Sequence, residues 1–218
     1  MVEEFKQYSY EVRRWPTNAA ACAALRDYIE VRSKSVGNSL SGTLGGGGLD
    51  FKGAELPEFD LADAYFGFAD LNGVDLSGSD LDRATFAGAQ LRNANLSGSN
   101  LHKAEADGCD GQRINLSGAR LFRASFADSD LRHADLRDCM LSATSFLMAD
   151  LRGADLRGCT FGPSPTRFVQ ARLHNAQFGG ATGEVRGPAI VDEDRLLAGR
   201  ELEEWFTAQG AIDLRVVE

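Results

Sequence analysis

The sequence has few cysteines and prolines, no long apolar segment and no excess of basic residues. Its 218 residues include 4 Cys and 5 Pro. The cysteines are too few for a disulfide scaffold, and none forms a Cys-x-x-Cys pair. No apolar run approaches the roughly 20 residues that span a bilayer, and the N-terminal residues lack the apolar core of a secretory signal. These absences predict a cytoplasmic protein that does not associate with a membrane.

The charge of the chain is acidic and unevenly distributed. The formal net charge is -9, which excludes a plain nucleic-acid binder with a basic face. Residues 49–110 hold 12 acidic and 4 basic residues, a net of -8, whereas residues 111–181 hold 6 acidic and 9 basic residues, a net of +3. We therefore expect no direct binding to nucleic acid.

A five-residue period dominates the middle of the chain. From Phe51 to Phe161, 21 of the 23 residues at five-residue spacing are Leu or Phe, and only Ala106 and Gly111 interrupt the series. A small or smaller apolar residue usually lies two positions before each, an Asp or Asn often lies between the two, and polar residues or Gly follow. This spacing fits neither an α-helix nor a flat strand. It predicts a chain that turns a corner every five residues.

A second period of twenty is superimposed on the first. Phenylalanine recurs at Phe66, Phe86, Phe126 and Phe146, so four five-residue units should form one coil. Stacked coils would then bury a continuous column of large apolar side chains. The insertion 162–167 adds two residues to the register, and Phe168 returns to the phenylalanine column. We interpret it as a corner loop before a last partial coil.

These repeats resemble the pentapeptide repeat family over residues 50–181. The resemblance implies an all-β solenoid, a right-handed quadrilateral β-helix, with small α/β caps. We predict an N-terminal cap over 1–48, with a short strand at Tyr8–Val12, a helix that begins after Thr17 and a flexible joint at Gly45–Gly48. The β-helix follows over 49–181. A strand-helix-strand element over 182–218, with its helix from Glu193 to Gln209, is either a cap or a dimerisation element.

Nothing in the sequence indicates catalysis, a metal or a cofactor. His102, His133 and His174 fall at outward positions and read as surface histidines. Cys109, Cys139 and Cys159 fall at small inward positions and read as core residues, and Cys22 belongs to the N-terminal helix. No nucleophile–base motif or phosphate-binding loop occurs. The Ala106/Gly111 interruption predicts either a local bulge or a hinge.

The family resemblance also implies a function. Its best understood members mimic duplex DNA, occupy the DNA site of gyrase, and inhibit it or protect it from drugs. A non-catalytic DNA mimic of this kind would bind DNA gyrase, a type II topoisomerase, through an acidic face on the first coils. We assign to that face Asp50, Glu55, Glu58, Asp60, Asp63, Asp70, Asp75, Asp80 and Asp82. The alternative is that Asp and Asn are frequent here because they stabilise the turns of the repeat.

A second hypothesis is an interaction scaffold with an unrelated protein partner. It would use outward apolar residues, namely Phe122, Met140, Leu147 and Met148, because exposed apolar patches mark interfaces. The alternative is that the C-terminal helix of the chain covers them. In gyrase-protecting members a C-terminal helix joins two rods, so the resemblance implies a homodimer through Leu202, Trp205 and Phe206.

Overall fold

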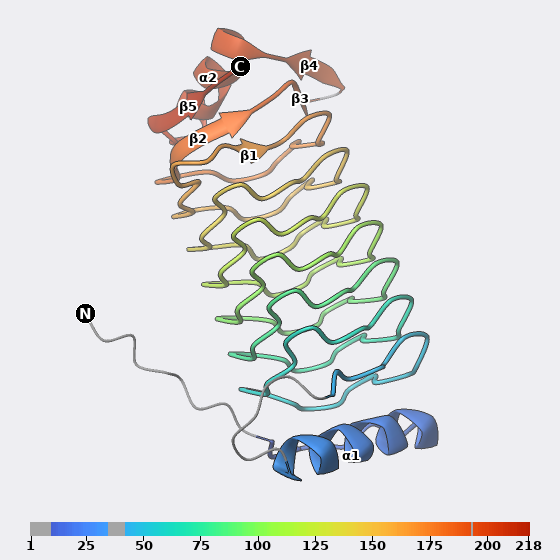
Figure 1. Ribbon diagram of the computed structural model, residues 1–218. Helices are drawn as coiled ribbons and strands as arrows, with labels where there is room; N and C mark the ends of the chain where they lie inside the picture. Colours follow the sequence, from blue (N-terminus) through green and yellow to red (C-terminus); the bar gives the residue numbers. More distant parts are fainter. Residues whose placement is uncertain (1–9, 35–41, 193) are drawn as a thin grey trace, which may run out of the picture.

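The computed structural model describes residues 10–34, 42–192 and 194–218, and it shows a rod of stacked coils with a helical element at each end (Figure 1). The elements are α1 (Ala19–Lys34), β1 (Thr166–Arg167), β2 (Thr182–Arg186), β3 (Ala189–Val191), β4 (Arg195–Leu197), α2 (Gly199–Ala208) and β5 (Asp213–Val216). Within these residues no helix is long and apolar enough to cross a bilayer.

Parallel bridges join each coil to the next at a spacing of twenty residues. Asp75, for example, bridges Asn95, which bridges Asn115. The backbone N–H of Leu76 donates to the carbonyl of Asn95 at 2.7 Å. After the insertion the spacing becomes twenty-two, as in the bridge between Ser145 and Arg167. The chain is therefore a repeat β-fold, with four bridges in every twenty residues.

A tight turn separates consecutive bridges. In one such turn the N–H of Ala64 donates to the carbonyl of Leu61 at 3.0 Å, and Asp63 has a φ of 60°. A positive φ at the third residue of a turn is typical of type II turns and favours glycine. At Gly88 there is a second reason: an added Cβ would lie 2.6 Å from the ring of Phe68.

The core is the column of large residues that the period predicts. The rings of Phe66 and Phe86 stack at 5.4 Å, and Phe146 stacks on Phe126 at 5.8 Å and on Phe168 at 5.5 Å. The last contact confirms that Phe168 rejoins this column after the insertion.

The Ala106/Gly111 interruption leaves the register unchanged. Glu105 still bridges Ser125, and Asp110 bridges Asp130. A Cβ on Gly111 would lie 2.9 Å from a methyl carbon of Leu131, so a neighbouring side chain fills this position. The expected bulge is therefore wrong, because the backbone ladder does not depend on the size of the inward side chain, and the hinge stays a prediction.

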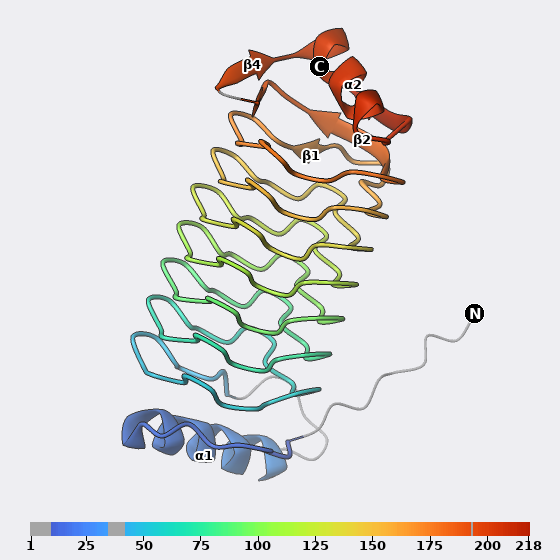
Figure 2. The same cartoon turned by 180° about the vertical axis from the view of Figure 1, so that it is seen from behind.

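The helix α1 closes the N-terminal end of the rod (Figure 2). Asn18, not Thr17, caps it: its Oδ1 accepts the N–H groups of Ala20 and Ala21 at 3.0 Å. Tyr8, the first residue of the expected strand, lies outside the described residues. Tyr10–Val12 are described and form no strand, and the isolated antiparallel bridge in this region joins Arg14 to Glu55.

The glycines predicted to form a flexible joint are packed into the first coil. The N–H of Gly46 donates to the carbonyl of Tyr65 at 2.7 Å. An added Cβ on Gly46 would lie 2.8 Å from both Phe51 and Phe66. Gly46 and Gly47 make room for aromatic rings, and the N–H of Gly48 donates to the carbonyl of Gly67 at 2.8 Å, so the interpretation as a flexible joint is wrong.

The C-terminal elements continue the stack and then close it. β1, β2 and β5 form a parallel sheet, and β3 pairs antiparallel with β4. The first strand of the expected strand-helix-strand element is split into β2 and β3 at Pro188, which has no N–H. The helix expected from Glu193 starts later, at Gly199, because residues 195–197 pair with β3.

Candidate binding surface

The nine carboxylates assigned to an acidic face lie on three sides of the first coils. A bridge pairs Asp60 with Asp80 on one side, whereas Asp50 pairs with Asp70 on another. A third column holds Glu55 and Asp75, and Glu58, Asp63 and Asp82 lie in the turns. The expectation of one face is wrong, because each step of five residues turns the chain to the next side.

Several of these carboxylates stabilise the turn that follows them. Oδ1 of Asp50 accepts the N–H of Lys52 at 2.9 Å, and Oδ1 of Asp75 accepts the N–H of Ser77 at 3.0 Å. Asn95 does the same for Ser97 in the next coil. This is the side-chain turn that Asp and Asn favour, so part of the acidic composition is structural.

Ion pairs neutralise another part of the acidic set. Arg83 binds Asp63 with Nε at 2.7 Å and Nη2 at 2.9 Å. Its hydrogen bonds hold the pKa of Asp63 below the usual range. Arg83 also reaches Asp82 at 2.5 Å. Asp60 is held by Arg32 at 2.9 Å and by the Tyr10 hydroxyl at 3.0 Å.

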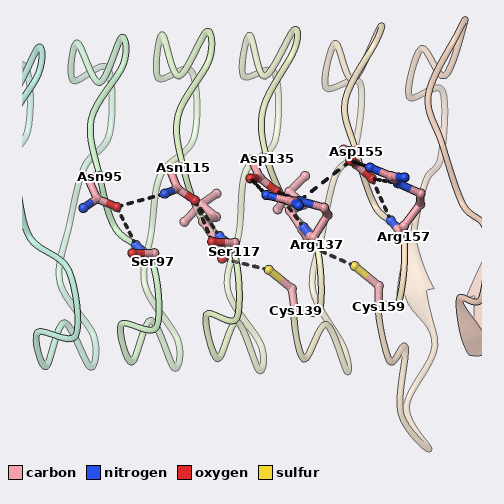
Figure 3. Close-up of polar contacts among 12 residues, drawn as sticks. Asn95, Ser97, Asn115, Ser117, Asp135, Arg137, Cys139, Asp155, Arg157 and Cys159 are labelled. Carbon is pink, nitrogen blue, oxygen red and sulfur yellow. Dashed lines mark hydrogen bonds and ion pairs between the residues drawn. The ribbon is translucent and has the colours of Figure 1, made fainter.

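The second half of the rod carries ladders of Arg–Asp pairs (Figure 3). Arg137 donates to Asp135 through Nε at 2.9 Å and Nη2 at 2.6 Å, and Arg157 binds Asp155 at the same two distances. The ladder also links coils, because Nε of Arg137 lies 3.8 Å from Asp155. These pairs compensate charge locally, so the second half lacks the acidic character of the first.

A groove of about 480 Å³ runs along one side of the rod. One wall is a bridge column that contains Asp80, Asn100, Arg120 and Met140. The other wall is the following turn of the same four coils, with Asp82, His102, Phe122 and Ser142. We call this feature the axial groove. It brings together residues from both predicted sets, the acidic set and the apolar set.

Side-chain contacts fix the walls of the axial groove. The His102 ring stacks on Phe122 with 5.4 Å between centroids and 6° between planes. Nδ1 of His102 lies 2.7 Å from Oδ1 of Asp82. Asn100 donates to Asp80 at 2.9 Å. Burial raises the pKa of Asp80, and the nearby charges of Asp60 and Asp82 raise it further.

The apolar residues predicted for an interface divide between two sites. Phe122 and Met140 line the axial groove, and Met140 is 54% exposed. Leu147 and Met148 lie in a different turn, where Met148 shares a depression with Ile190 and Leu196. Helix α2 packs on the end of the core, where Trp205 and Phe206 contact Phe178.

The three residues predicted for dimerisation are buried within this chain. Leu202 and Phe206 are fully buried and Trp205 nearly so. The Phe206 ring lies 4.9 Å from Phe178 and 6.3 Å from Phe168. They close the C-terminal end of the core and are not available to a second copy.

The remaining candidates behave as core or surface residues. Cys109, Cys139 and Cys159 are buried, as predicted, and Cys139 donates to the carbonyl of Leu116. Among the described residues, no group of three or more His, Cys, Asp or Glu side chains could hold a metal ion. Sequence reasoning treated His102 as a plain surface residue and missed Asn100 and Arg120. Sorting outward residues by the period of twenty would have aligned all three with Met140 and Phe122.

Comparison with solved structures gives similar proteins at low identity. HetL from Nostoc sp. strain PCC 7120, a pentapeptide repeat protein involved in heterocyst differentiation regulation, is 22% identical, with 68% of this chain and 87% of HetL covered and a TM-score of 0.28. QnrB1, a plasmid-mediated fluoroquinolone resistance protein, is 18% identical, with 74% and 94% covered and a TM-score of 0.39. A pentapeptide repeat protein from the Arabidopsis thaliana thylakoid lumen is 18% identical, with 79% and 83% covered and a TM-score of 0.21.

Comparison with curated proteins gives no match. The family model for pentapeptide repeats matches eight copies, over residues 60–98, 94–121 and 119–158. The matched segments coincide with the regular coils, where bridges recur every twenty residues. Residues 60–158 of the chain are therefore pentapeptide repeats.

Proposed function

We propose that this protein is a non-catalytic binding protein that mimics duplex DNA, binds the type II topoisomerase DNA gyrase in the cytoplasm, and modulates it or protects it from inhibitors. The rod is taken as a right-handed quadrilateral β-helix, the fold that the repeat implies. The observation that carries the proposal is the placement of carboxylates on three sides of the first coils. Duplex DNA likewise presents charge around its axis rather than along one face.

Linear charge density supports this comparison. Residues 49–110 carry a net charge of -8 over about three coils, or about 15 Å at strand spacing. Duplex DNA of that length carries roughly nine phosphates. A basic DNA-binding channel would therefore meet a similar charge on either rod, which favours electrostatic complementarity.

A supercoiling assay with purified gyrase tests the proposal. The informative variant replaces Asp70, Asp75 and Asp80 by Asn and Glu58 by Gln. Asn95 and Asn100 already occupy the columns of Asp75 and Asp80, so the turn hydrogen bonds are retained while four charges are lost. The wild type should inhibit supercoiling, or rescue gyrase from a fluoroquinolone, at micromolar protein, and the variant should lose most of this effect.

The matched control removes the same charge from the C-terminal element. It replaces Glu184, Glu201, Glu204 and Glu218 by Gln and should act like the wild type. Equal activity of the acidic-coil variant and the wild type would refute the mimic, as would the absence of any effect of the wild type on gyrase.

The second candidate function is an interaction scaffold with an unrelated protein partner. It is favoured by the axial groove, where Met140 and Phe122 offer apolar contact. Binding through the groove should depend less on salt than binding through exposed carboxylates. A homodimer through Leu202, Trp205 and Phe206 is not part of either proposal, because these side chains are buried in the chain itself.

A further inference from the structure

We propose that the axial groove binds an extended peptide segment of a protein partner, with a basic side chain at the Asp80/Asp82 end and an apolar side chain at the Met140/Phe122 end. This inference does not rest on the proposed action on gyrase. It concerns a different ligand, and its test measures peptide binding directly.

The acidic end of the groove favours a cation. Asp80 and Asp82 lie in one turn, and Asp60 lies directly below Asp80 in the preceding coil. Among the described residues the carboxylate of Asp80 has hydrogen-bond donors but no ion pair. Arg83 already pairs with Asp82 at 2.5 Å, and Arg32 pairs with Asp60 at 2.9 Å. Asp80 is therefore the carboxylate with which a guanidinium or ammonium group would pair, and a partly desolvated site strengthens such pairing.

The opposite end offers apolar contact on a fixed surface. Met140 is 54% exposed, and its flexible thioether adapts to the shape of a ligand. The Phe122 ring contacts the His102 ring, at 5.4 Å between centroids, and the guanidinium carbon of Arg123, at 5.0 Å from its centroid. An apolar side chain can pack here without reordering the wall, which lowers the entropic cost of binding.

The distance between the two ends selects the ligand conformation. Asp80 and Met140 are three coils apart, or about 14 Å at strand spacing. An extended peptide covers this distance in about four residues at roughly 3.3 Å each. Between the ends, Asn100 and Arg120 present side-chain N–H donors along the groove. An extended peptide has free carbonyl groups that can accept them.

Methyl NMR of methionine provides a direct test, because the chain has only 3 Met. Met140 lies in the groove and Met148 lies in another turn, so Met148 serves as an internal control. The probe is the peptide acetyl-Arg-Ser-Gly-Ser-Leu-amide. We expect a saturable shift of the Met140 methyl signal, with no shift of the Met148 signal, at peptide concentrations up to about 5 mM.

Matched peptides and one protein variant complete the test. A peptide with Gln for Arg, or with Ala for Leu, should bind the wild-type protein at least about 5-fold more weakly than the probe does. The probe should also bind the Asp80→Asn variant at least about 5-fold more weakly than it binds the wild-type protein. That variant keeps the turn, because Asn100 fills the same position one coil away. The proposal is overturned if Met140 does not shift, if Met148 shifts equally, or if the Gln and Ala peptides bind as well as the probe.

Discussion

The imidazole of His102 stacks on the ring of Phe122 with 5.4 Å between centroids and 6° between planes. The two residues are twenty positions apart, so the contact exists only because the chain has completed one coil. The same imidazole reaches Asp82 at 2.7 Å. This contact therefore connects a carboxylate of the predicted acidic set to an aromatic ring of the predicted apolar set. Residues from both predicted binding sets therefore line the same axial groove.

Asp60 should contribute more to stability than Asp63 does. Asp60 accepts bonds from Arg32 at 2.9 Å and from Tyr10 at 3.0 Å, with side-chain exposures of 22% for Asp60 and 16% for Arg32. We expect Asp60→Asn to lower the free energy of unfolding by about 1–3 kcal/mol, because buried donors lose a charged acceptor. Asp63→Asn breaks a more exposed pair with Arg83 and should cost about 1 kcal/mol or less.

Urea unfolding of both variants checks this difference, and hydrogen exchange in α1 locates it. Asp60→Asn should speed exchange in the helix, since Arg32 belongs to α1. Equal stability of the two variants would show that the contact between α1 and the first coil contributes little. Asp60 would then count among the carboxylates that are available to bind a partner.

The aromatic column predicts a large loss on truncation. Phe146 is fully buried between Phe126 and Phe168. We expect Phe146→Ala to cost about 3–5 kcal/mol, because it removes a large buried side chain and leaves a cavity. Phe68→Ala is the matched control: Phe68 is 72% exposed, so its loss should cost about 0.5 kcal/mol or less. Urea unfolding of the two variants measures this difference, provided that the slopes of their unfolding free energies against urea are equal. Similar midpoints for Phe146→Ala and Phe68→Ala would contradict the prediction.

The spacing of large residues predicts the coil and its core because both depend on the inward side chains alone. The period of twenty aligned Phe66 with Phe86, and the rings stack. The outward residues follow the same period of twenty, but their role depends on the side chains that they meet in neighbouring coils. Charge counted over one stretch of sequence predicts a single acidic face, because the count ignores the corner that the chain turns every five residues. Asp70 and Asp80 in fact lie in different columns.

The ends were harder to predict because they lack the repeat. Thr17 and Asn18 are both good capping residues, and only the geometry selects Asn18. Residues 195–197 are compatible with a helix by composition, but they pair with β3 instead. The glycines at 45–48 show the same difficulty. The absence of a side chain at Gly46 accommodates Phe66, and its absence at Gly47 accommodates Tyr65, contacts that no local pattern reveals.

The contact at Gly46 predicts opposite outcomes for two neighbouring glycines. A Cβ on Gly46 would lie 2.8 Å from Phe51 and Phe66, whereas a Cβ on Gly45 meets nothing within 4 Å. We expect Gly46→Ala to lower stability by about 1–3 kcal/mol through overpacking. Gly45→Ala should be neutral or slightly stabilising, because it restricts the unfolded chain. Thermal unfolding of the two variants checks this, and an unchanged midpoint for Gly46→Ala would restore the flexible joint.

The buried thiols predict a loss of stability in alkaline solution. Burial raises the pKa of Cys109 from 9.0 to about 12. Between those values the unfolded thiol releases its proton and the folded thiol keeps it, so the unfolded state binds fewer protons. Stability must then fall as the pH rises above about 9, by about 1 kcal/mol at pH 10 for one such group. Burial also raises the pKa of Tyr10 to about 12, which adds a further loss of stability in alkaline solution.

Urea unfolding at pH 8 and at about pH 10 measures this decrease, and Cys109→Ala isolates the part due to one thiol. The variant should fold, because Ala89 occupies the equivalent inward position one coil earlier. It should lose less stability between the two pH values than the wild type does. In the folded wild type, iodoacetamide should modify the half-buried Cys22 before Cys109. Rapid alkylation of Cys109, or an identical pH dependence in the variant, would mean that the inward position is open to solvent.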